Sequence, residues 1–450
     1  MALPPGPSAP SLVQAMRWMR SPVDLMEDCH ERFGETFTLR MARVGELVFI
    51  SDPPSIKQLF SSDRENELPE GRTVLLEPVL GSRSLLLLEG DEHLSSRRLM
   101  LPPFHGKRMR TYEAVMEEIT HREIDTWPLR QRFPLHPRMQ SITLEVILRA
   151  VFGIEDPVRR ERLRELLVRI LNQASSPRAQ VIGLALRRLG RLGPYRRFQG
   201  LLDDTDAVLF KQIAERRADP KLSERDDILS LLVAARFEDG EPMSDAEIRD
   251  QLMTLLLAGH ETTATALAWA FDLLFRNPEA LERLSAELEE GGDDYLGAVA
   301  TETLRVRPVV PSVGRLITSQ AELGGYELPA GTAVMPSIYL VHMRPDVYPQ
   351  PHRFRPERFL DGGPDTYSWI PFGGGTRRCL GGAFASFEMK VVLRTVLRRA
   401  VLRAATDGPE PWGHRNVTLS PRNGTPAILE ERRPLPEAAP AALDSERVQV

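Results

Sequence analysis

The pattern of hydrophobic and polar positions predicts a mostly helical chain. Its clearest helix runs from Ser244 to Arg276 and ends at Asn277-Pro278. Ser244 and Glu247 are spaced as a capping box at its start. At 1.5 Å per residue this helix would be about 48 Å long, enough to cross a whole domain. Its middle, Leu252 to Ala270, is largely apolar on every face, so we expect it to be buried.

Two β-rich regions interrupt the helical pattern. Thr36 to Ser51 carries β-rich runs on either side of Val44-Gly45, which predicts a hairpin. Arg315 to Ser337 is also β-rich and contains turn residues at Gly324-Gly325. From about Pro345 to Gly375 the chain is dense in Pro, Gly and Arg, and long irregular segments of that kind are usually functional. The predicted fold class is therefore mainly α with small β-sheets.

The composition is that of an ordinary globular protein, with 450 residues of which 42% are hydrophobic and 27% charged. A net charge of −5 gives no reason to expect nucleic acid or an anionic membrane as the main partner. No run approaches the roughly 20 apolar residues that span a bilayer, so we expect no transmembrane anchor. The first ten residues lack the pattern of a secretory signal, and we expect a cytoplasmic protein.

The chain divides into three parts. Residues 1–11 are a Pro-rich lead-in, residues 12–430 form one domain, and residues 431–450 are a tail rich in Pro, Ala and charge. Such a tail cannot bury enough apolar surface to fold, so it is predicted to be disordered.

The two cysteines, Cys29 and Cys379, are too few for a disulfide framework and favour a reducing compartment. Cys29 lies in an apolar-periodic stretch, which predicts a small buried side chain. Cys379 lies in a glycine-rich stretch, Phe372 to Gly381, directly before an apolar helical run. The glycines would deliver a thiol to a helix N-terminus, where amide N–H groups favour the thiolate. A structural cysteine in a glycine-rich turn is the alternative.

Polar residues also occur inside the long predicted helix, at Ala258-Gly-His-Glu-Thr-Thr263. Burying the Glu261 carboxylate is costly unless it is paired or used. The Thr262 hydroxyl can bond to a carbonyl one turn earlier and open a local groove for water. His260-Glu261 begins like the zinc-protease motif H-E-x-x-H, but Ala264 replaces the second zinc ligand. A partly exposed helix segment with ordinary polar residues is the alternative.

Two further pairs have helical spacing. Glu302 and Arg305 can form an ion pair on one helix face, and His93 and Arg97 can hold one anion together. For both pairs the alternative is a solvated helix surface.

These motifs together resemble the cytochrome P450 family. Its signature F-x-x-G-x-R-x-C-x-G is matched at Phe372, Gly375, Arg377, Cys379 and Gly381. The segment from Ala258 to Thr263 matches the family's A/G-G-x-D/E-T-T, Glu302 and Arg305 match its E-x-x-R, and His93 and Arg97 match its W/H-x-x-x-R. The resemblance covers about residues 12–429.

The resemblance implies a single triangular domain that encloses haem b (iron protoporphyrin IX), with Cys379 as the axial ligand of the iron. The residues expected at the cofactor are His93, Arg97, Ala258, Arg315, Phe372, Gly373, Arg377, Cys379 and Gly381. Within this set, Arg377, Arg315 and the pair His93–Arg97 would bind the haem propionates. Glu302, Arg305 and Arg358 would form a buried structural triad.

The resemblance further implies a haem-thiolate monooxygenase. The thiolate pushes electron density towards O–O cleavage. Thr262 would steady the activated dioxygen and its waters, and Glu261 would relay the protons that O–O cleavage requires. The enzyme would use O2 and electrons from a separate ferredoxin with its reductase, or a flavodoxin-type donor. It would hydroxylate or epoxidise a lipophilic small molecule such as a fatty acid, terpenoid, steroid or polyketide.

Three alternatives remain open at this point: a haem-thiolate enzyme that uses or rearranges a peroxide, a non-catalytic haem sensor or carrier, and a helical interaction protein without a cofactor. Glu261 and Thr262 argue against the peroxide-using enzyme, because enzymes that start from a peroxide have less need of a proton relay. The substrate, the position of attack, the redox partner and the oligomeric state do not follow from the sequence.

Two surface hypotheses concern positive charge. The Arg-rich stretch from Arg159 to Arg197 would attract anionic substrates or a membrane surface, with a solvated basic face as the default interpretation. Lys107, Arg108, Arg378 and Arg394 would form a basic patch for an acidic electron donor.

Overall fold

The structure, a computed structural model, describes residues 3–63, 72–104, 106–174, 194–362, 365–415 and 417–435. Its α-helices are α1 (Ser11–Arg20), α2 (Pro22–Phe33), α3 (Pro53–Ser61), α4 (Arg72–Leu80), α5 (Gly90–Met100), α6 (Glu113–Asp125), α7 (His136–Val146), α8 (Pro157–Ala174), α10 (Pro194–Arg217), α11 (Ile228–Ala234), α12 (Asp245–Arg276), α13 (Pro278–Glu290), α14 (Asp294–Val306), α15 (Ile338–His342) and α16 (Gly382–Arg399). Short 3-10 turns are η1 (Pro102–Phe104), η2 (Gly106–Tyr112), η4 (Leu222–Glu224), η5 (Pro356–Phe359) and η6 (Gly375–Arg377), and the π-helical turn η3 (Ile147–Val151) continues α7.

The strands are β1 (Thr36–Met41), β2 (Gly45–Ile50), β3 (Arg132–Pro134), β4 (Arg315–Leu316), β5 (Ala321–Leu323), β6 (Tyr326–Leu328), β7 (Ala333–Pro336), β8 (Ala400–Ala404), β9 (Trp412–Arg415), β10 (Thr418–Pro421) and β11 (Pro426–Arg432). They form small sheets with the orders β1-β2-β7-β4, β3-β11-β8, β10-β9 and β5-β6. In the largest sheet β2 and β7 are parallel, and the other pairs are antiparallel.

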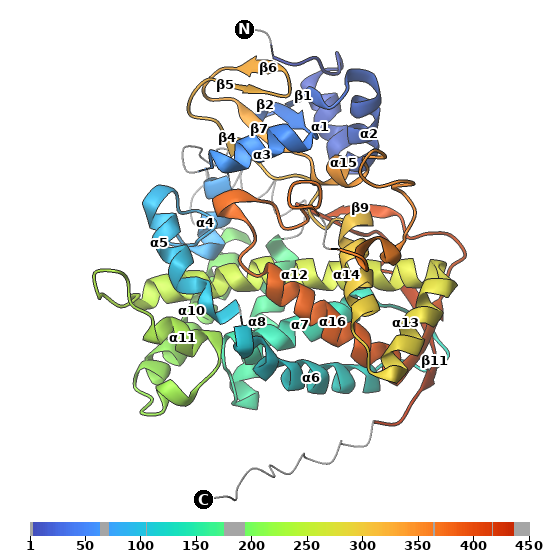
Figure 1. The fold of residues 1–450 in the computed structure, drawn as a ribbon. Coiled ribbons are helices and arrows are strands. Elements are labelled where there is room, and N and C mark those ends of the chain that lie inside the picture. The colour runs from blue at the N-terminus through green and yellow to red at the C-terminus, as the bar shows by residue number, and fades with distance from the viewer. Residues whose placement is uncertain are drawn as a thin grey trace, which may run out of the picture.

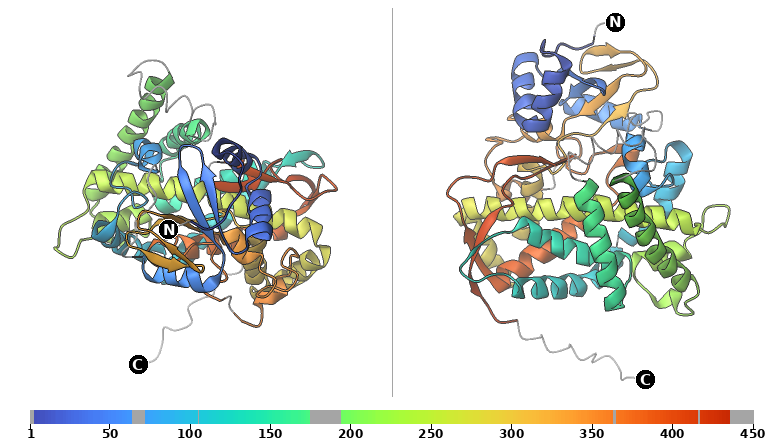
Figure 2. Two further views of the ribbon diagram at one scale, coloured as in Figure 1. Left: turned by 90° about the horizontal axis from the view of Figure 1, so that it is seen from above. Right: turned by 180° about the vertical axis from the view of Figure 1, so that it is seen from behind.

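The molecule has a strand-containing part and a larger helical part (Figure 1). The sheet of β1, β2, β4 and β7 lies with α1, α2 and α3 at one end, and α12 crosses the helical part from side to side (Figures 1 and 2). This mainly α architecture with small sheets confirms the predicted fold class. No helix of the described residues combines the length and the apolar character needed to cross a bilayer.

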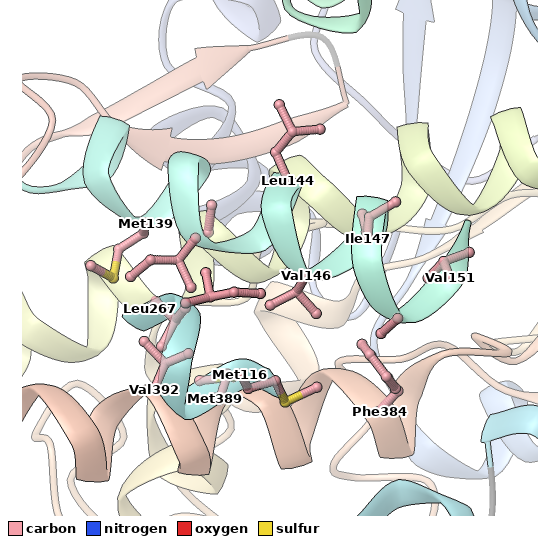
Figure 3. Packing of buried hydrophobic residues seen from close by; sticks show 14 of the residues in the cluster. Met116, Met139, Leu144, Val146, Ile147, Val151, Leu267, Phe384, Met389 and Val392 are labelled. Atoms are coloured by element: carbon pink, nitrogen blue, oxygen red, sulfur yellow. The ribbon is translucent and has the colours of Figure 1, made fainter. Parts of the chain in front are cut away.

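The long helix α12 begins as its sequence predicts. The Ser244 hydroxyl accepts from the Glu247 N–H at 3.2 Å, and the Glu247 carboxylate accepts from the Ser244 N–H at 2.8 Å, which completes the capping box. The main core forms where α12 meets α7, α6 and α16. Figure 3 shows Leu267 in one buried cluster with Met139, Met116, Met389 and Val392, which come from α12, α7, α6 and α16. Each of these side chains is buried, and such burial is worth about 1.5–3 kcal/mol.

The β-rich regions are also found where predicted. β1 and β2 pair antiparallel with Thr36 opposite Ile50, which confirms the hairpin. Between 315 and 337 the chain forms β4 to β7, and Gly324-Gly325 turns the chain between β5 and β6. Within the described part of 345–375, the elements are the short turn η5 and the start of η6, so this segment is irregular as predicted.

The segments predicted to flank the domain contact it at both ends. The lead-in packs against β1, because Thr38 donates its N–H to the Pro5 carbonyl at 2.9 Å and its hydroxyl to the Pro4 carbonyl at 2.8 Å. At the other end β11 continues to Arg432, opposite Ala400, so the sheet extends two residues into the segment predicted as a tail. Residues 436–450 of that segment lie outside the described residues.

Candidate active site

The Cys379 loop, residues Phe372 to Gly381, leads from the irregular segment into α16. Its amide N–H at Cys379 donates to the Phe372 carbonyl at 2.9 Å and closes the loop. Gly381 caps α16, and its N–H donates to the Cys379 sulfur. Gly373 has φ 67°, a left-handed conformation that favours glycine. The loop therefore presents the thiol at a helix start, where amide groups favour negative charge.

Cys379 is solvent-accessible, while Cys29 is buried as predicted. Burial among surrounding protein atoms nevertheless raises the pKa of the Cys379 thiol, and the Gly381 amide, Arg97 and Arg378 oppose that rise. A side chain that has accessible surface but is also desolvated typically faces a recess inside the protein. We therefore infer that the Cys379 sulfur faces such a recess.

The middle of α12 carries an accessible stripe on an otherwise buried helix. Leu255, Gly259 and Thr262 are half-buried and Ala258 is exposed, although most of the helix from Leu252 to Ala270 is buried. These positions recur three and four residues apart, so they share one face. The expectation that this segment is buried on every face is thus wrong along this stripe. The Thr262 hydroxyl donates to the Ala258 carbonyl at 2.6 Å, as its position predicts.

Glu261 adjoins this stripe but is held by other elements. Its carboxylate accepts from Gln140 Nε2 of α7 at 2.6 Å and from Arg415 Nη1 of β9 at 3.4 Å. Burial raises the pKa of Glu261, while Arg415 and the Gln140 hydrogen bond lower it. His136 Nε2 lies 3.8 Å from the same carboxylate, and burial lowers the pKa of His136 to about 4, so this histidine is neutral near pH 7.

Gln140, Arg415 and His136 were not predicted from the sequence. His136, Gln140 and Thr143 recur at positions i, i+4 and i+7 of α7, and this polar stripe on a largely buried helix could have been noticed. Thr143 donates to the His260 carbonyl at 3.1 Å, so the stripe faces α12. The strand that carries Arg415 offers no comparable pattern.

Helix α5 brings the Arg97 guanidinium near Cys379. His93 is buried and Arg97 is half-buried. Burial lowers the pKa of Arg97, and the charged groups that act on it are Cys379 and Arg378, with no carboxylate of the described residues among them. Arg377 donates to the Leu88 carbonyl at 2.6 Å, just before α5. The guanidinium of Arg97 is therefore partly desolvated, and among the described groups that act on it only Cys379 opposes its positive charge, a setting that favours a bound anion.

Arg315 has a different environment. It forms a buried ion pair with Asp63, in which Nη2 lies 3.1 Å from the carboxylate, and it donates to the Gly374 carbonyl at 3.1 Å. Asp63 also accepts from the Thr376 hydroxyl and the Arg377 N–H. Asp63 was not predicted, because it belongs to no recognised motif and lies far from Arg315 in sequence.

Glu302, Arg305 and Arg358 meet in the core. Arg305 donates to both oxygens of Glu302 at 2.7 Å, and Arg358 Nε lies 3.4 Å from the same carboxylate. Glu302 and Arg305 are completely buried. The Arg355 N–H also donates to Glu302 at 2.8 Å, so α14 is tied to the start of η5.

Comparison with known proteins identifies the family of this chain. The family model described as Cytochrome P450 matches residues 4–425. The chain belongs to the cytochrome P450 family. A relative in Mycobacterium tuberculosis, cytochrome P450 135B1, is 44% identical over 430 residues, which cover 94% of this chain and 90% of the relative. A second from that species, cytochrome P450 137, is 42% identical over 394 residues, 88% of this chain and 83% of the relative.

Solved structures show the same fold. A cyanobacterial cytochrome, CYP120A1, with retinoic acid bound has a TM-score of 0.80 and 25% identity, covering 95% of this chain and 99% of its own. The haem domain of cytochrome P450DA has a TM-score of 0.81 at 24% identity, covering 96% and 98%. The chain is therefore an enzyme of the cytochrome P450 monooxygenase class, and its cofactor is haem b.

The residues present fit that cofactor. Cys379 offers an accessible sulfur that receives an amide hydrogen bond, and Arg97 offers a desolvated cation close to that sulfur. The accessible stripe of α12 includes the small residues Ala258 and Gly259, which leave room beside a flat group. Within the described chain no cluster of His, Cys, Asp or Glu could hold a separate metal ion.

The basic surfaces of this P450 are partly neutralised where they are described. Of the predicted docking patch, Arg394 pairs with Glu113 and with Glu117 of α6, whereas Arg378 is exposed. The side chains of Lys107 and Arg108 lie outside the described residues. In the Arg-rich stretch, Arg162 pairs with Asp204 of α10 at 3.1 Å and Arg164 with Glu161 at 3.1 Å, and residues 175–193 are not described.

Proposed function

We propose that this P450 activates O2 with electrons from a separate ferredoxin or flavodoxin-type protein and hydroxylates or epoxidises a lipophilic small molecule. Fatty acids, terpenoids, steroids and polyketides are the candidate substrates, and the cytoplasm is the expected location. The observation that carries the proposal is the accessible stripe of α12, with the Thr262 hydroxyl on it and the Glu261 carboxyl beside it. A hydroxyl and an acid on this face are the groups that dioxygen reduction needs.

Each site residue has a role in this proposal. Bound haem supplies the chemistry that inserts one oxygen atom of O2 into the substrate, while the other atom leaves as water. Cys379 holds the iron through its sulfur. Arg97, with His93 and Arg377, binds the haem carboxylates, because charge-assisted hydrogen bonds to a carboxylate are strong.

Thr262 and Glu261 handle protons. The Thr262 hydroxyl already donates to the Ala258 carbonyl, so its oxygen is free to accept from a water on the accessible side. Because burial raises the pKa of Glu261, the acid can hold a proton closer to neutral pH than an exposed glutamate. Arg415, about one-third exposed, marks the side from which that proton is replaced.

The accessible stripe of α12 is mostly apolar. Leu255 and Ala258 offer no charged group to a ligand, which favours a lipophilic compound. The structurally similar cyanobacterial protein was solved with retinoic acid bound, and a compound with a long apolar part is compatible with such a surface.

Turnover with isotopically labelled dioxygen tests the proposal. The purified enzyme is given a ferredoxin, its reductase and a panel of lipophilic compounds under ¹⁸O₂, and in parallel hydrogen peroxide without electron donors. We expect products that contain one ¹⁸O atom and depend on the electron donor. Products that form only with peroxide would instead identify a peroxide-using enzyme, and substrate-independent failure of the haem to accept electrons would favour a sensor.

A further inference from the structure

The end of α3 is joined to the Cys379 loop through one buried carboxylate. The side chains of Asp63 and Arg315 are only 1% and 4% exposed, and the guanidinium contacts the carboxylate through both Nε and Nη2. The same carboxylate accepts the Thr376 hydroxyl at 3.0 Å and the Arg377 N–H at 3.3 Å. Asp63 therefore connects α3, β4 and the loop that carries the thiol.

The loop lies unusually close to α3 at this point. A Cβ atom on Gly375 would lie 2.3 Å from an Asp63 carboxylate oxygen, and one on Gly374 would lie 2.2 Å from the Phe60 ring. Both distances are far below van der Waals contact, so only glycine allows this approach. The close approach therefore depends on the two glycines of the loop as well as on the side chains of Phe60 and Asp63.

The hydrogen-bonding capacity of Arg315 is nearly used. A guanidinium has five N–H groups. Arg315 makes two bonds to Asp63, one to the Gly374 carbonyl and one from Nη1 to the Gly314 carbonyl at 2.9 Å. Little capacity remains for a further anion, although sequence comparison predicts this residue at a haem propionate.

We propose that Asp63 and Arg315 are positioning residues that fix the Cys379 loop, and that Asp63 is the principal anionic partner of Arg315. Asp63 holds Thr376 and the Arg377 backbone, three and two residues before Cys379, and so sets where the sulfur lies. The pair acts through the loop and does not touch the reacting atoms. This inference rests on the proposed role of Cys379 as the iron ligand.

Haem retention and the carbon monoxide spectrum test the inference in the holoenzyme. We compare Asp63→Asn with the milder Thr376→Val, which removes one contact without uncovering a charge. The control is Asp227→Asn, which breaks another buried ion pair, between Arg216 and Asp227, away from the loop. Haem transfer to excess apomyoglobin, the reduced carbonyl spectrum, the reduction potential and the thermal unfolding of each variant are measured.

Asp63→Asn should release haem on the order of tenfold faster, in line with the effect of residues that orient metal ligands, and should increase the fraction of carbonyl complex without the thiolate shift. Its reduction potential should rise, because a negative charge near the site is removed. Thr376→Val should change the same quantities in the same direction by a few-fold, and Asp227→Asn should lower only thermal stability.

Wild-type haem release and spectra in both Asp63→Asn and Thr376→Val would overturn the inference. An equal haem loss in Asp227→Asn would also overturn it, because general destabilisation would then explain the effect. If the carbonyl complex of the wild-type protein itself lacked the thiolate shift, Cys379 would not be the iron ligand. That outcome is distinct from a failure of the positioning role of Asp63.

Discussion

Gln140 of α7 donates its amide N–H to the Glu261 carboxylate at 2.6 Å, so the acid beside Thr262 is oriented by a neighbouring helix. Arg415 holds the second oxygen of the same carboxylate at 3.4 Å. Both contacts favour the ionised acid, whereas burial favours the neutral acid and dominates. The protonation of Glu261 therefore depends on a balance between α7, β9 and desolvation.

Replacing Gln140 with Leu should shift the pH dependence of turnover. Loss of the hydrogen bond raises the pKa of Glu261 further, so the acid keeps its proton to a higher pH, and the alkaline decline of kcat should move upward. Glu261→Gln removes the titrating group and should lower kcat by about 100-fold, the usual contribution of a general acid. Steady-state rates across pH measure both effects. An alkaline limb that stays in place in Gln140→Leu would argue that Glu261 does not limit proton delivery.

Thr262→Ala should uncouple electron use from product formation. Without the hydroxyl, water on the accessible face of α12 loses its partner, and reduced oxygen should leave as hydrogen peroxide. We expect product per electron to fall several-fold, while NAD(P)H consumption in the reconstituted system continues. Thr303→Ala is a matched control, since its hydroxyl also bonds back one turn, to Val299 at 2.7 Å, in a different helix, α14. Equal coupling in wild type and Thr262→Ala would refute the assigned role.

Cys379→His should abolish the strongly red-shifted Soret band of the reduced carbonyl complex. That band would require Cys379 to hold the iron as a thiolate, and imidazole does not reproduce it. Cys29→Ala should retain the band, because Cys29 is buried in α2 among apolar residues. Absorption spectra of the reduced proteins with and without carbon monoxide decide the matter, and a band that survives in Cys379→His would exclude this cysteine as the ligand.

The sequence predicted those parts of the molecule that depend on local pattern. The capping box of α12, the hairpin of β1 and β2, and the glycine-rich turn before α16 each follow from residues close together in the chain. Motif resemblance added the ion pair between Glu302 and Arg358, which periodicity does not show.

Contacts between distant segments were not predictable in the same way. Asp63 meets Arg315 across 252 positions and Arg415 meets Glu261 across 154, and neither Asp63 nor Arg415 stands in a recognisable motif. Their roles depend on how elements pack, because a single charged residue on the sequence is more often solvated. The accessible stripe of α12 followed only from motif resemblance, through Ala258 and Thr262. Periodicity did not show it, because Leu, Ala and Gly look like core residues whether they face a neighbour or a cofactor.

The buried triad should matter for stability more than any surface ion pair. Glu302→Gln leaves Arg305 and Arg358 without a full counter-charge in the core, and breaking a buried pair typically costs about 3–5 kcal/mol. The exposed pair Arg403–Glu430 serves as the control, and Glu430→Gln should cost less than about 1 kcal/mol. Urea unfolding of the haem-loaded proteins measures both. If Glu302→Gln and Glu430→Gln lost similar amounts of unfolding free energy, the buried triad would stabilise the protein no more than a surface ion pair does.

Glu388 of α16 should make the protein less stable as pH rises. Its side chain is buried, its Oε1 has no hydrogen-bond partner, and burial raises its pKa to about 8. In the unfolded chain the same group titrates near pH 4.3, so between roughly pH 4 and 8 the folded state binds more protons than the unfolded state. The contribution of protonated Glu388 to the free energy of unfolding is therefore fully present below about pH 4. As the pH rises from about 4 to 8, the free energy of unfolding falls by about 1.4 kcal/mol for each pH unit.

Glu388→Gln removes this titration while keeping a polar side chain of similar size. The variant should therefore be more stable than wild type near pH 8, by about 3–5 kcal/mol, and the difference should shrink as the pH falls towards 5. Glu289→Gln, at an exposed position of α13, should follow the wild-type pH dependence. Urea unfolding at several pH values provides the comparison. Parallel stability curves for wild type and Glu388→Gln would show that Glu388 is ionised in the folded protein, paired with a group that burial alone does not reveal.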